Sequence, residues 1–409
     1  MIFLYFLIFA MPFYRHQILD AGSGLFTVVK AVGALGLVAS AINIANHGIP
    51  DYLGSRQARL FFAIAGLAAI SFLRFGRPPQ LEIGSPIYIY ASMTVFFVII
   101  VSLVDTPEKV KWVLLVALAS AAFASLYILR EFQQYHLQFL DFRPGGKVVG
   151  DANYFSLAAM LAVPIGYFWF IAERRPVYRW AILGALVITS LAIAVSGSRG
   201  GLLALIAFIC FVIRRSHHRL RNSCILMLLL IPPMLLVSRN PIVRLLHPDV
   251  AARMGTQARY DTWVAGLRMV RDRPIGGIGL GEFKPTVGVY AENPRLAKMA
   301  HNTYLELASE LGIPCLILYL WLILETYRSL GRTSELARRF HSPLLNSVAV
   351  GMQGGIIGFL VSSFFLSAEY VKFFWFYVFF SIALLRVTRR WALRQMKGQG
   401  GTLAPTYSV

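Results

Sequence analysis

The sequence predicts an all-α polytopic membrane protein with about 12 transmembrane helices and one large, partly helical loop outside the bilayer. Of its 409 residues, 57% are hydrophobic and 14% are charged, whereas a soluble domain carries about a quarter charged residues. The mean hydropathy is +0.64. A net charge of +20 would favour a nucleic-acid partner in a soluble protein. In a membrane protein it indicates basic cytoplasmic loops, and we expect no nucleic-acid binding.

Apolar runs bounded by charged residues, proline or glycine mark the expected helices. The first run is short, because crossing a bilayer takes about 20 residues. The expected ranges are 2–14, 24–42, 58–73, 86–104, 110–130, 151–172, 177–196, 199–213, 222–238, 303–327, 344–366 and 370–388. This divides the chain into N-terminal transmembrane helices (1–150), central transmembrane helices (151–238), an outer loop (239–302) and C-terminal transmembrane helices with a basic cytoplasmic tail (303–409).

The basic residues predict how these helices are oriented. Clusters recur in every second connection, as at 174–179, 214–221 and 328–339, whereas the connections between them hold few lysines or arginines. Because short cytoplasmic loops carry an excess of lysine and arginine, both termini are expected in the cytoplasm. The outer loop then lies on the periplasmic face.

The outer loop is itself basic, with ten basic and five acidic residues. A net positive loop on the outer face runs against the usual distribution and favours a polyanionic ligand. Contact with anionic membrane lipids is the simpler alternative.

The middle of this loop predicts a surface helix followed by a tight turn. Tyr260, Trp263, Leu267 and Val270 recur at helical spacing, which is typical of an amphipathic helix lying on a membrane. Pro274 should end that helix. The glycines at 276, 277, 279 and 281 should form the turn. No strand is expected before them, so they do not favour a nucleotide site.

A short turn at 196–198 joins two expected spans and places Arg199 at the start of the second. A cation at a helix N-terminus is electrostatically unfavourable. A bound phosphate would offset that cost, because backbone N–H groups and a guanidinium can bind the same anion. The alternative is an interfacial arginine whose glycine neighbours serve helix packing.

His301 lies where the basic outer loop meets the apolar run 303–327. Thr303 and Glu306 fit a capping box that would start the next helix. The positive end of that helix dipole would favour a neutral imidazole, which can accept a proton. A histidine that only hydrogen-bonds within a loop is the simpler alternative. Glu306 and Glu310 should point into the bundle or a water-filled cleft rather than into lipid.

Other polar residues lie at the expected outer helix ends. Asp151 and Asn153 open the run 151–172, and a helix N-cap is the simplest role for either of them. They could instead bind sugar hydroxyl groups. Asn302 and Tyr304, beside the histidine, are further candidates for contacting a glycan or supporting the site.

Three patterns resemble the O-antigen ligase superfamily, also called the Wzy-type C-terminal domain family. His301 and Gly312 match its His-x10-Gly motif, and Arg199 and Leu203 match its Arg-x3-Leu motif. A third run is similar to the family's Gly-Arg…Trp…Pro…Gly-x-Gly…Phe pattern, and consists here of Arg259, Trp263, Pro274, Gly277, Gly279 and Phe283. Ala258 stands where the family usually has the first glycine.

The resemblance implies a metal-independent glycosyltransferase, without a cofactor, in the bacterial inner membrane. The donor would be a glycan on undecaprenyl pyrophosphate. For a ligase, the acceptor would be a sugar hydroxyl of the lipid A core at the periplasmic face. Arg199 and Arg259 would bind the pyrophosphate, and His301 would activate the acceptor hydroxyl. Arg268, on the expected surface helix, is a further candidate for pyrophosphate binding, or for a headgroup contact.

Other functions are compatible with the same pattern. An O-antigen or exopolysaccharide polymerase would use the same chemistry with a second lipid-linked glycan as acceptor. A protein O-oligosaccharyltransferase would need more room for its acceptor than the outer loop offers. A flippase for lipid-linked oligosaccharides belongs to a different class, and predicts ionisable residues near the middle of the membrane and related halves. Charge concentrated at the outer interface favours the enzyme.

Overall fold

The computed structural model describes residues 1–13, 27–48, 54–75, 85–135, 151–215, 250–292 and 299–398. It also describes 51, 144, 220–221 and 224–228. In the helix that begins at Val250, side chains are described from Gln257 onward. The predicted span at 222–238 therefore lies mostly outside the described residues.

The secondary structure of the described residues is helical, as predicted. The main elements are α1 (Ile2–Ala10), η1 (Met11–Phe13), α2 (Val28–His47), α3 (Arg56–Phe75), α4 (Pro86–Leu103), α5 (Pro107–Tyr135), α6 (Ala152–Ala172), α7 (Pro176–Ser196), α8 (Arg199–Arg215), α11 (Val250–Asp272), α12 (Phe283–Tyr290), α13 (Thr303–Arg339), α14 (Pro343–Ser362) and α15 (Lys372–Gly398). The expected helix at 303–327 extends well beyond its apolar run.

Eight of the described helices are long and apolar enough to span a membrane, namely α2 to α7, α13 and α14. The chain is thus a multi-pass membrane protein, but the prediction of about 12 spans is not met by these helices. The apolar helix at Ile2–Phe13 is too short, and α8 has 17 residues. The helix α15 has the length but carries Lys372, Arg386 and Arg389 in its first 18 residues.

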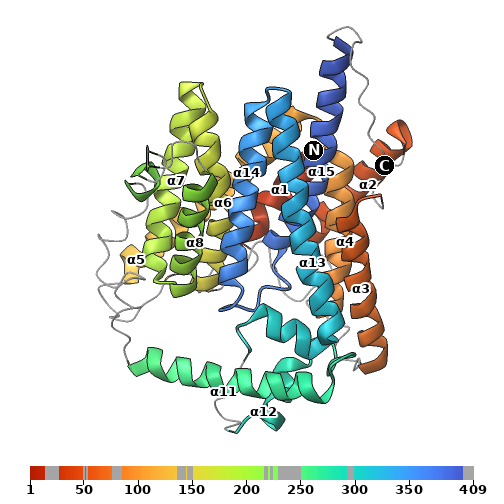
Figure 1. Cartoon of the computed structure of the whole chain (residues 1–409), viewed down its shortest axis with the longest axis vertical. Coiled ribbons are helices and arrows are strands. Elements are labelled where there is room, and N and C mark those ends of the chain that lie inside the picture. The colour runs from red at the N-terminus through yellow and green to blue at the C-terminus, as the bar shows by residue number, and fades with distance from the viewer. Residues whose placement is uncertain are drawn as a thin grey trace.

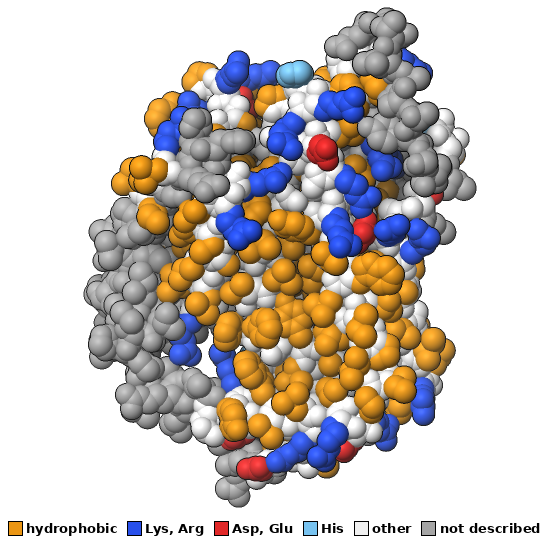
Figure 2. All heavy atoms as spheres, in the orientation of Figure 1, with side chains coloured by type: hydrophobic (Ala, Val, Ile, Leu, Met, Phe, Trp, Pro, Cys, Tyr) orange, Lys and Arg blue, Asp and Glu red, His pale blue; other side chains and the backbone are white. Residues whose placement is uncertain are grey.

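The long helices stand side by side, and α11 lies across one end of the bundle with α12 beyond it (Figure 1). In the same orientation, a band of hydrophobic side chains separates basic side chains at the two ends (Figure 2). Such a band is the surface that lipid tails require. The partly helical outer loop of the prediction therefore corresponds to the layer made by α11 and α12, which we call the outer layer.

The centre of the bundle is α14, which packs against α6, α8 and α13. Glycines make this packing close. A Cβ atom at Gly351 would lie 2.6 Å from the Cα of Ile165, and one at Gly354 would lie 2.8 Å from the Phe208 ring. Small residues let transmembrane helices approach each other in this way. The helices that begin or end near the outer layer are consequently held in fixed relative positions.

Candidate functional site

Arg199 is the first residue of α8, as predicted. The preceding helix α7 ends at Gly197, whose φ of 61° is left-handed. Ser198 then caps α8, since its Oγ accepts from the N–H of Gly201 at 3.2 Å. A Cβ atom at Gly201 would lie 2.8 Å from the Cβ of Ser156 in α6. The turn is therefore pressed against the start of α6, which leaves Arg199 at a fixed position.

Asp151 is the N-cap of α6. Its Oδ1 accepts from the N–H groups of Asn153 at 2.6 Å and Tyr154 at 3.4 Å. Of the two residues considered as caps from the sequence, the structure uses Asp151. A hydrogen bond of 2.8 Å between the Oγ atoms of Ser156 and Ser196 ties the start of α6 to the end of α7. Asp151 and Arg199 thus belong to neighbouring, cross-linked helix ends.

The surface helix α11 brings Arg259 to the same place. Burial lowers the pKa of the Arg259 guanidinium, and the positive charge of Arg199 lowers it further, while Asp151 raises it. The two guanidinium groups and the carboxylate are therefore close enough to interact, although they come from α8, α11 and the start of α6. We call Arg199 and Arg259 the arginine pair.

The arginine pair is a candidate site for binding an anion. Among the residues that the structure describes, neither guanidinium has a hydrogen-bond or ion-pair partner. Asp151 supplies one nearby negative charge, and its Oδ1 already accepts the capping hydrogen bonds. Two partly buried cations beside one anion favour binding of a further anion, and guanidinium forks suit phosphate oxygens.

His301 is held between two anchors. The Nε1 of Trp263 donates to the carbonyl of Ala300 at 2.7 Å, and Ala300 is completely buried. On the other side, Asn302 caps α13 by accepting from the N–H groups of Tyr304 and Leu305 at 3.1 and 3.2 Å. His301 itself is half-buried and has φ +48°, which is uncommon outside glycine. Because Trp263 follows Arg259 by one helical turn, α11 positions both the arginine and the histidine.

The predicted capping box at Thr303 and Glu306 is wrong, because Asn302 caps the helix one residue earlier. Thr303 instead donates its Oγ to the carbonyl of Leu366 at 2.7 Å. The Glu306 carboxylate accepts from the Oγ of Ser367. Both residues therefore bind the connection between α14 and α15, and their side chains are buried as expected for polar groups facing the bundle.

Gly312 divides α13. Its φ of +83° is non-helical, and a Cβ atom there would lie 2.1 Å from the carbonyl oxygen of Ile275. The turn at residues 274–281, which we call the glycine turn, fits into this break. The N–H of Ile313 donates to the carbonyl of Pro274 at 2.8 Å. Gly277 is equally confined, since a Cβ atom there would lie 2.2 Å from the carbonyl oxygen of Glu310.

The Glu310 carboxylate also connects α13 to the end of the glycine turn. It accepts from the N–H groups of Gly281 and Phe283 at 2.9 and 3.1 Å and from the Tyr370 hydroxyl at 2.8 Å. The glycines of the turn are thus explained by close backbone contact. Glu310 therefore links α13 to the glycine turn and to Tyr370.

Arg268 is separated from the arginine pair. Nine residues after Arg259 at about 3.6 residues per turn, it lies on the opposite side of α11. Its guanidinium donates to the carbonyl of Tyr290 at 2.9 Å and to the Glu292 carboxylate at 2.7 Å. Two residues of the predicted apolar face of α11, Tyr260 and Leu267, are exposed, as a face that lies on a membrane would be.

The side of α11 that packs carries small or unbranched side chains, which the sequence pattern did not single out. These buried residues are Thr262, Ala265, Gly266 and Met269.

Most of the residues that form this site lie in one stretch of sequence. Residues 184–320 match the family model Wzy_C, which is described as O-antigen ligase. The Wzy_C segment runs from α7 into α13 and contains Arg199, Arg259, His301 and Gly312. Asp151 lies before it. A comparison with curated proteins gives no match.

The Wzy_C match accords with the multi-pass fold. The family includes O-antigen ligases and polymerases, and the match suggests transferase activity on lipid-linked glycans. It supports the resemblance that the three sequence patterns gave.

Sequence reasoning missed the connection between α14 and α15, where Ser367, Glu369 and Tyr370 lie. These residues contact or surround the polar face of α13. The available signal was Glu369, a carboxylate between two apolar runs, which usually faces the interior of a bundle.

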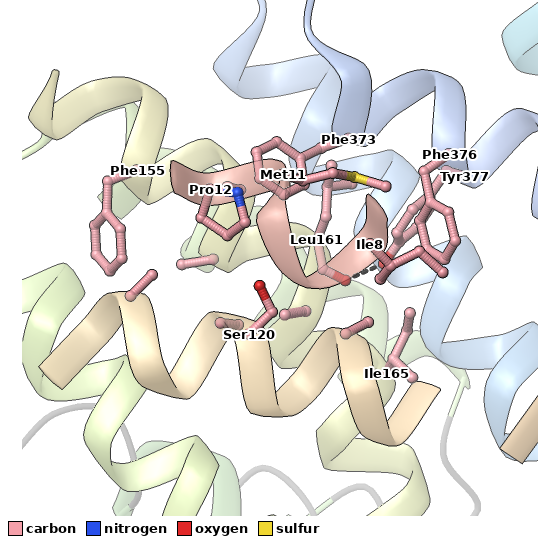
Figure 3. A pocket seen from close by; sticks show the side chains of 16 residues that line it. Ile8, Met11, Pro12, Ser120, Phe155, Leu161, Ile165, Phe373, Phe376 and Tyr377 are labelled. Carbon is pink, nitrogen blue, oxygen red and sulfur yellow. Dashed lines mark hydrogen bonds between the residues drawn. The ribbon is translucent and has the colours of Figure 1, made fainter. Parts of the chain in front are cut away.

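Outside the Wzy_C segment, an apolar pocket separates the short N-terminal helix from α5, α6 and α15 (Figure 3). Ile8, Met11 and Phe376 point into it, and Ser120 donates to the carbonyl of Phe9 at 2.7 Å. Its volume of about 50 Å³ is far smaller than a cavity that holds even benzene. The pocket is a packing gap and is too small for a polyprenyl chain.

Proposed function

We propose that this protein is an O-antigen ligase of the bacterial inner membrane. It would transfer a glycan from undecaprenyl pyrophosphate to a sugar hydroxyl of the lipid A core on the periplasmic face. The observation that carries the proposal is the arginine pair. Arg199 and Arg259 come from separate helices and interact with each other, and the nearby Asp151 carboxylate offsets one of their two positive charges. A pyrophosphate would neutralise the remaining positive charge.

In the proposed reaction, the acceptor oxygen bonds to the anomeric carbon of the donor sugar as the bond from that carbon to the pyrophosphate oxygen breaks. The electron pair of the broken bond stays on the pyrophosphate, where the two guanidinium groups stabilise the developing charge. His301 takes the proton of the attacking hydroxyl. Attack opposite the leaving group inverts the anomeric centre. The arginine pair supplies the charge stabilisation that a divalent cation supplies in other transferases, so the proposed mechanism is metal-independent.

The other candidate residues support this arrangement in different ways. Asp151 and Asn302 cap the helices beside the arginine pair and His301. Glu306, Glu310 and the hydroxyl of Tyr304, which donates to the carbonyl of Leu360 at 2.8 Å, hold the outer end of α13. Asn153 is partly exposed and is the candidate among them for a glycan contact.

The proposal is tested by reconstituting the full chain in liposomes with a lipid-linked glycan donor, without added metal and with EDTA. Two acceptors compete, a lipid A core glycolipid and a second lipid-linked glycan. We expect the donor glycan to appear on lipid A core. Extension of the lipid-linked glycan would make the protein a polymerase. Movement of donor across the bilayer without any product would make it a transporter.

A further inference from the structure

A second basic site lies at the outer end of α3. The guanidinium groups of Arg74 and Arg273 lie over the ring of Phe75, at 5.1 and 5.5 Å from its centroid. Neither has an ion-pair partner among the described residues. Holding two like charges against one ring raises their mutual repulsion, which an anion between or beside them would relieve.

The glycine turn fixes this site to the frame of the protein. The N–H of Leu280 donates to the Oγ of Ser71 in α3 at 3.0 Å. A Cβ atom at Gly279 would lie 3.1 Å from the Cβ of Phe75, so the ring packs directly on the turn. Phe75 and the two guanidinium groups are therefore placed by contacts between α3 and the outer layer.

A cavity of about 180 Å³ opens beside Arg273, with room for several water molecules or one sugar ring. We call it the Tyr290 cavity, and its lining residues are Phe75, Arg273, Ile278, Glu282, Thr286 and Tyr290. The lining combines a guanidinium, two hydroxyl groups, two aromatic rings and a carboxyl group. The site therefore contains two formal positive charges, from Arg74 and Arg273, and one formal negative charge, from Glu282. Its net formal charge is positive.

Arg268 holds one lining residue of this cavity, Tyr290, in place. It donates to the carbonyl of Tyr290 and pairs with Glu292, which fastens the end of α12 to α11. Because Arg268 and Arg259 face opposite sides of α11 and are nine residues apart, about 13 Å separate their positions along the helix. The Tyr290 cavity is therefore distinct from the arginine pair.

We propose that the Tyr290 cavity binds an acidic sugar, one that carries a phosphate or a carboxylate, within the acceptor glycan. The guanidinium groups of Arg74 and Arg273 pair with the anionic group. Tyr290 and Thr286 contact the ring and its hydroxyl groups. That the sugar belongs to the acceptor rests on the proposed function, whereas the binding of an acidic sugar does not.

The test measures binding to the full chain in nanodiscs by saturation-transfer NMR, without any transfer reaction. The probes are glucose 6-phosphate, glucuronic acid, glucose and glycerol 1-phosphate. The variants are Arg273→Gln, Arg74→Gln and the charge-retaining Arg273→Lys. Arg271→Gln is the matched control, because Arg271 lies two residues before Arg273, is exposed, and does not line the cavity. Its guanidinium lies 3.8 Å from the Asp272 carboxylate.

We expect the two acidic sugars to bind and glucose not to bind. Either glutamine variant should weaken acidic-sugar binding about tenfold or more, which corresponds to one charged hydrogen bond, and Arg273→Lys should retain part of it. Unchanged binding in both glutamine variants would overturn the proposal. So would binding of glycerol 1-phosphate as strong as that of glucose 6-phosphate, since the site would then hold a lipid headgroup.

Failure of the proposed function leaves a different signature. If wild-type protein binds the acidic sugars but yields no glycan transfer in liposomes, the cavity stands and the transferase proposal falls. If transfer proceeds with equal efficiency to an acceptor and to its dephosphorylated, decarboxylated form, the cavity has no part in acceptor selection.

Discussion

Two groups of polar side chains differ in how their hydrogen-bonding atoms are paired. At the joint of the glycine turn with α13, Glu310 accepts from two backbone N–H groups and a tyrosine hydroxyl, and backbone hydrogen bonds complete the contact. In the arginine pair, whose members come from α8 and α11, neither guanidinium has a hydrogen-bond or ion-pair partner among the described residues. Buried polar groups are normally paired. The contrast separates residues that hold the protein together from residues available to a substrate.

The strongest test of this contrast is the change His301→Ala. We expect transfer to fall by about 10³-fold or more, because a positioned general base contributes about 10²–10⁴-fold, while the protein remains inserted and folded. Product formation in liposomes measures the rate of transfer, and thermal unfolding shows whether the variant is folded. His341→Ala is the control, since His341 has a similar positive φ (+53°) beyond the other end of α13. A folded His301→Ala protein with normal activity would remove the histidine from the mechanism.

A positive charge alone should not replace either guanidinium of the arginine pair. Arg199→Lys and Arg259→Lys are each expected to lower transfer about 10²-fold, because an ammonium group cannot reproduce bidentate contact with a phosphate. Arg214→Lys, at the exposed far end of α8, should leave the rate unchanged. Initial rates at saturating acceptor measure the effect, and full activity of both lysine variants would contradict pyrophosphate binding by this pair.

Replacing Gly312, where the glycine turn meets α13, should lower the free energy of unfolding. Gly312→Ala forces a Cβ atom to within 2.1 Å of the Ile275 carbonyl and requires a left-handed backbone, so we expect a loss of about 1–3 kcal/mol or more. Gly184→Ala is the control, because no atom lies within 4 Å of the added Cβ. Thermal unfolding in detergent compares the two. Equal melting temperatures would show that the glycine turn does not need this contact.

A smaller effect is expected at Glu369. Burial raises its pKa, and the nearby carboxylates of Glu306 and Glu310 raise it further. The folded protein thus holds this proton more tightly than the unfolded chain. The resulting stabilisation is present below the ordinary pKa of 4.5 and is lost as the pH rises towards the raised value.

Glu369→Gln, which stays neutral, should melt higher than the wild type at pH 8. The difference should shrink towards pH 5, with roughly 2–4 °C expected for each kcal/mol. Glu335→Gln is the matched control, because Glu335 is exposed on α13. A pH profile parallel to that of the wild type would contradict the assignment.

The sequence predicted well what depends on local pattern. Hydropathy located the helices of the bundle, and the start of α8 at Arg199 and the cap at Asp151 follow from short-range rules. The cap of α13 was misplaced by one residue because Asn302 and Thr303 both suit an N-cap, and the backbone of the incoming loop decides between them.

Contacts between distant segments could not be predicted in the same way. No local pattern brings Asp151 to Arg259, or Glu310 to Tyr370. Arg268 shows the limit most clearly, since its partners Tyr290 and Glu292 lie beyond a turn whose path the sequence does not specify. The roles assigned to Arg199, Arg259 and His301 remain predictions for the experiments above.

The glycine turn affects which parts of the protein can open locally and exchange their amide hydrogens. Its N–H groups at Ile278 and Gly279 donate to the carbonyls of Ser309 and Glu310, at 2.9 and 3.1 Å. These amides should therefore resist hydrogen exchange as strongly as those inside α13, and open with it as one cooperative unit. A layer coupled to α13 in this way should not move independently of the helix bundle. For the proposed reaction, we therefore expect the lipid-linked donor to reach the arginine pair along the membrane plane while the layer of α11 and α12 stays in place.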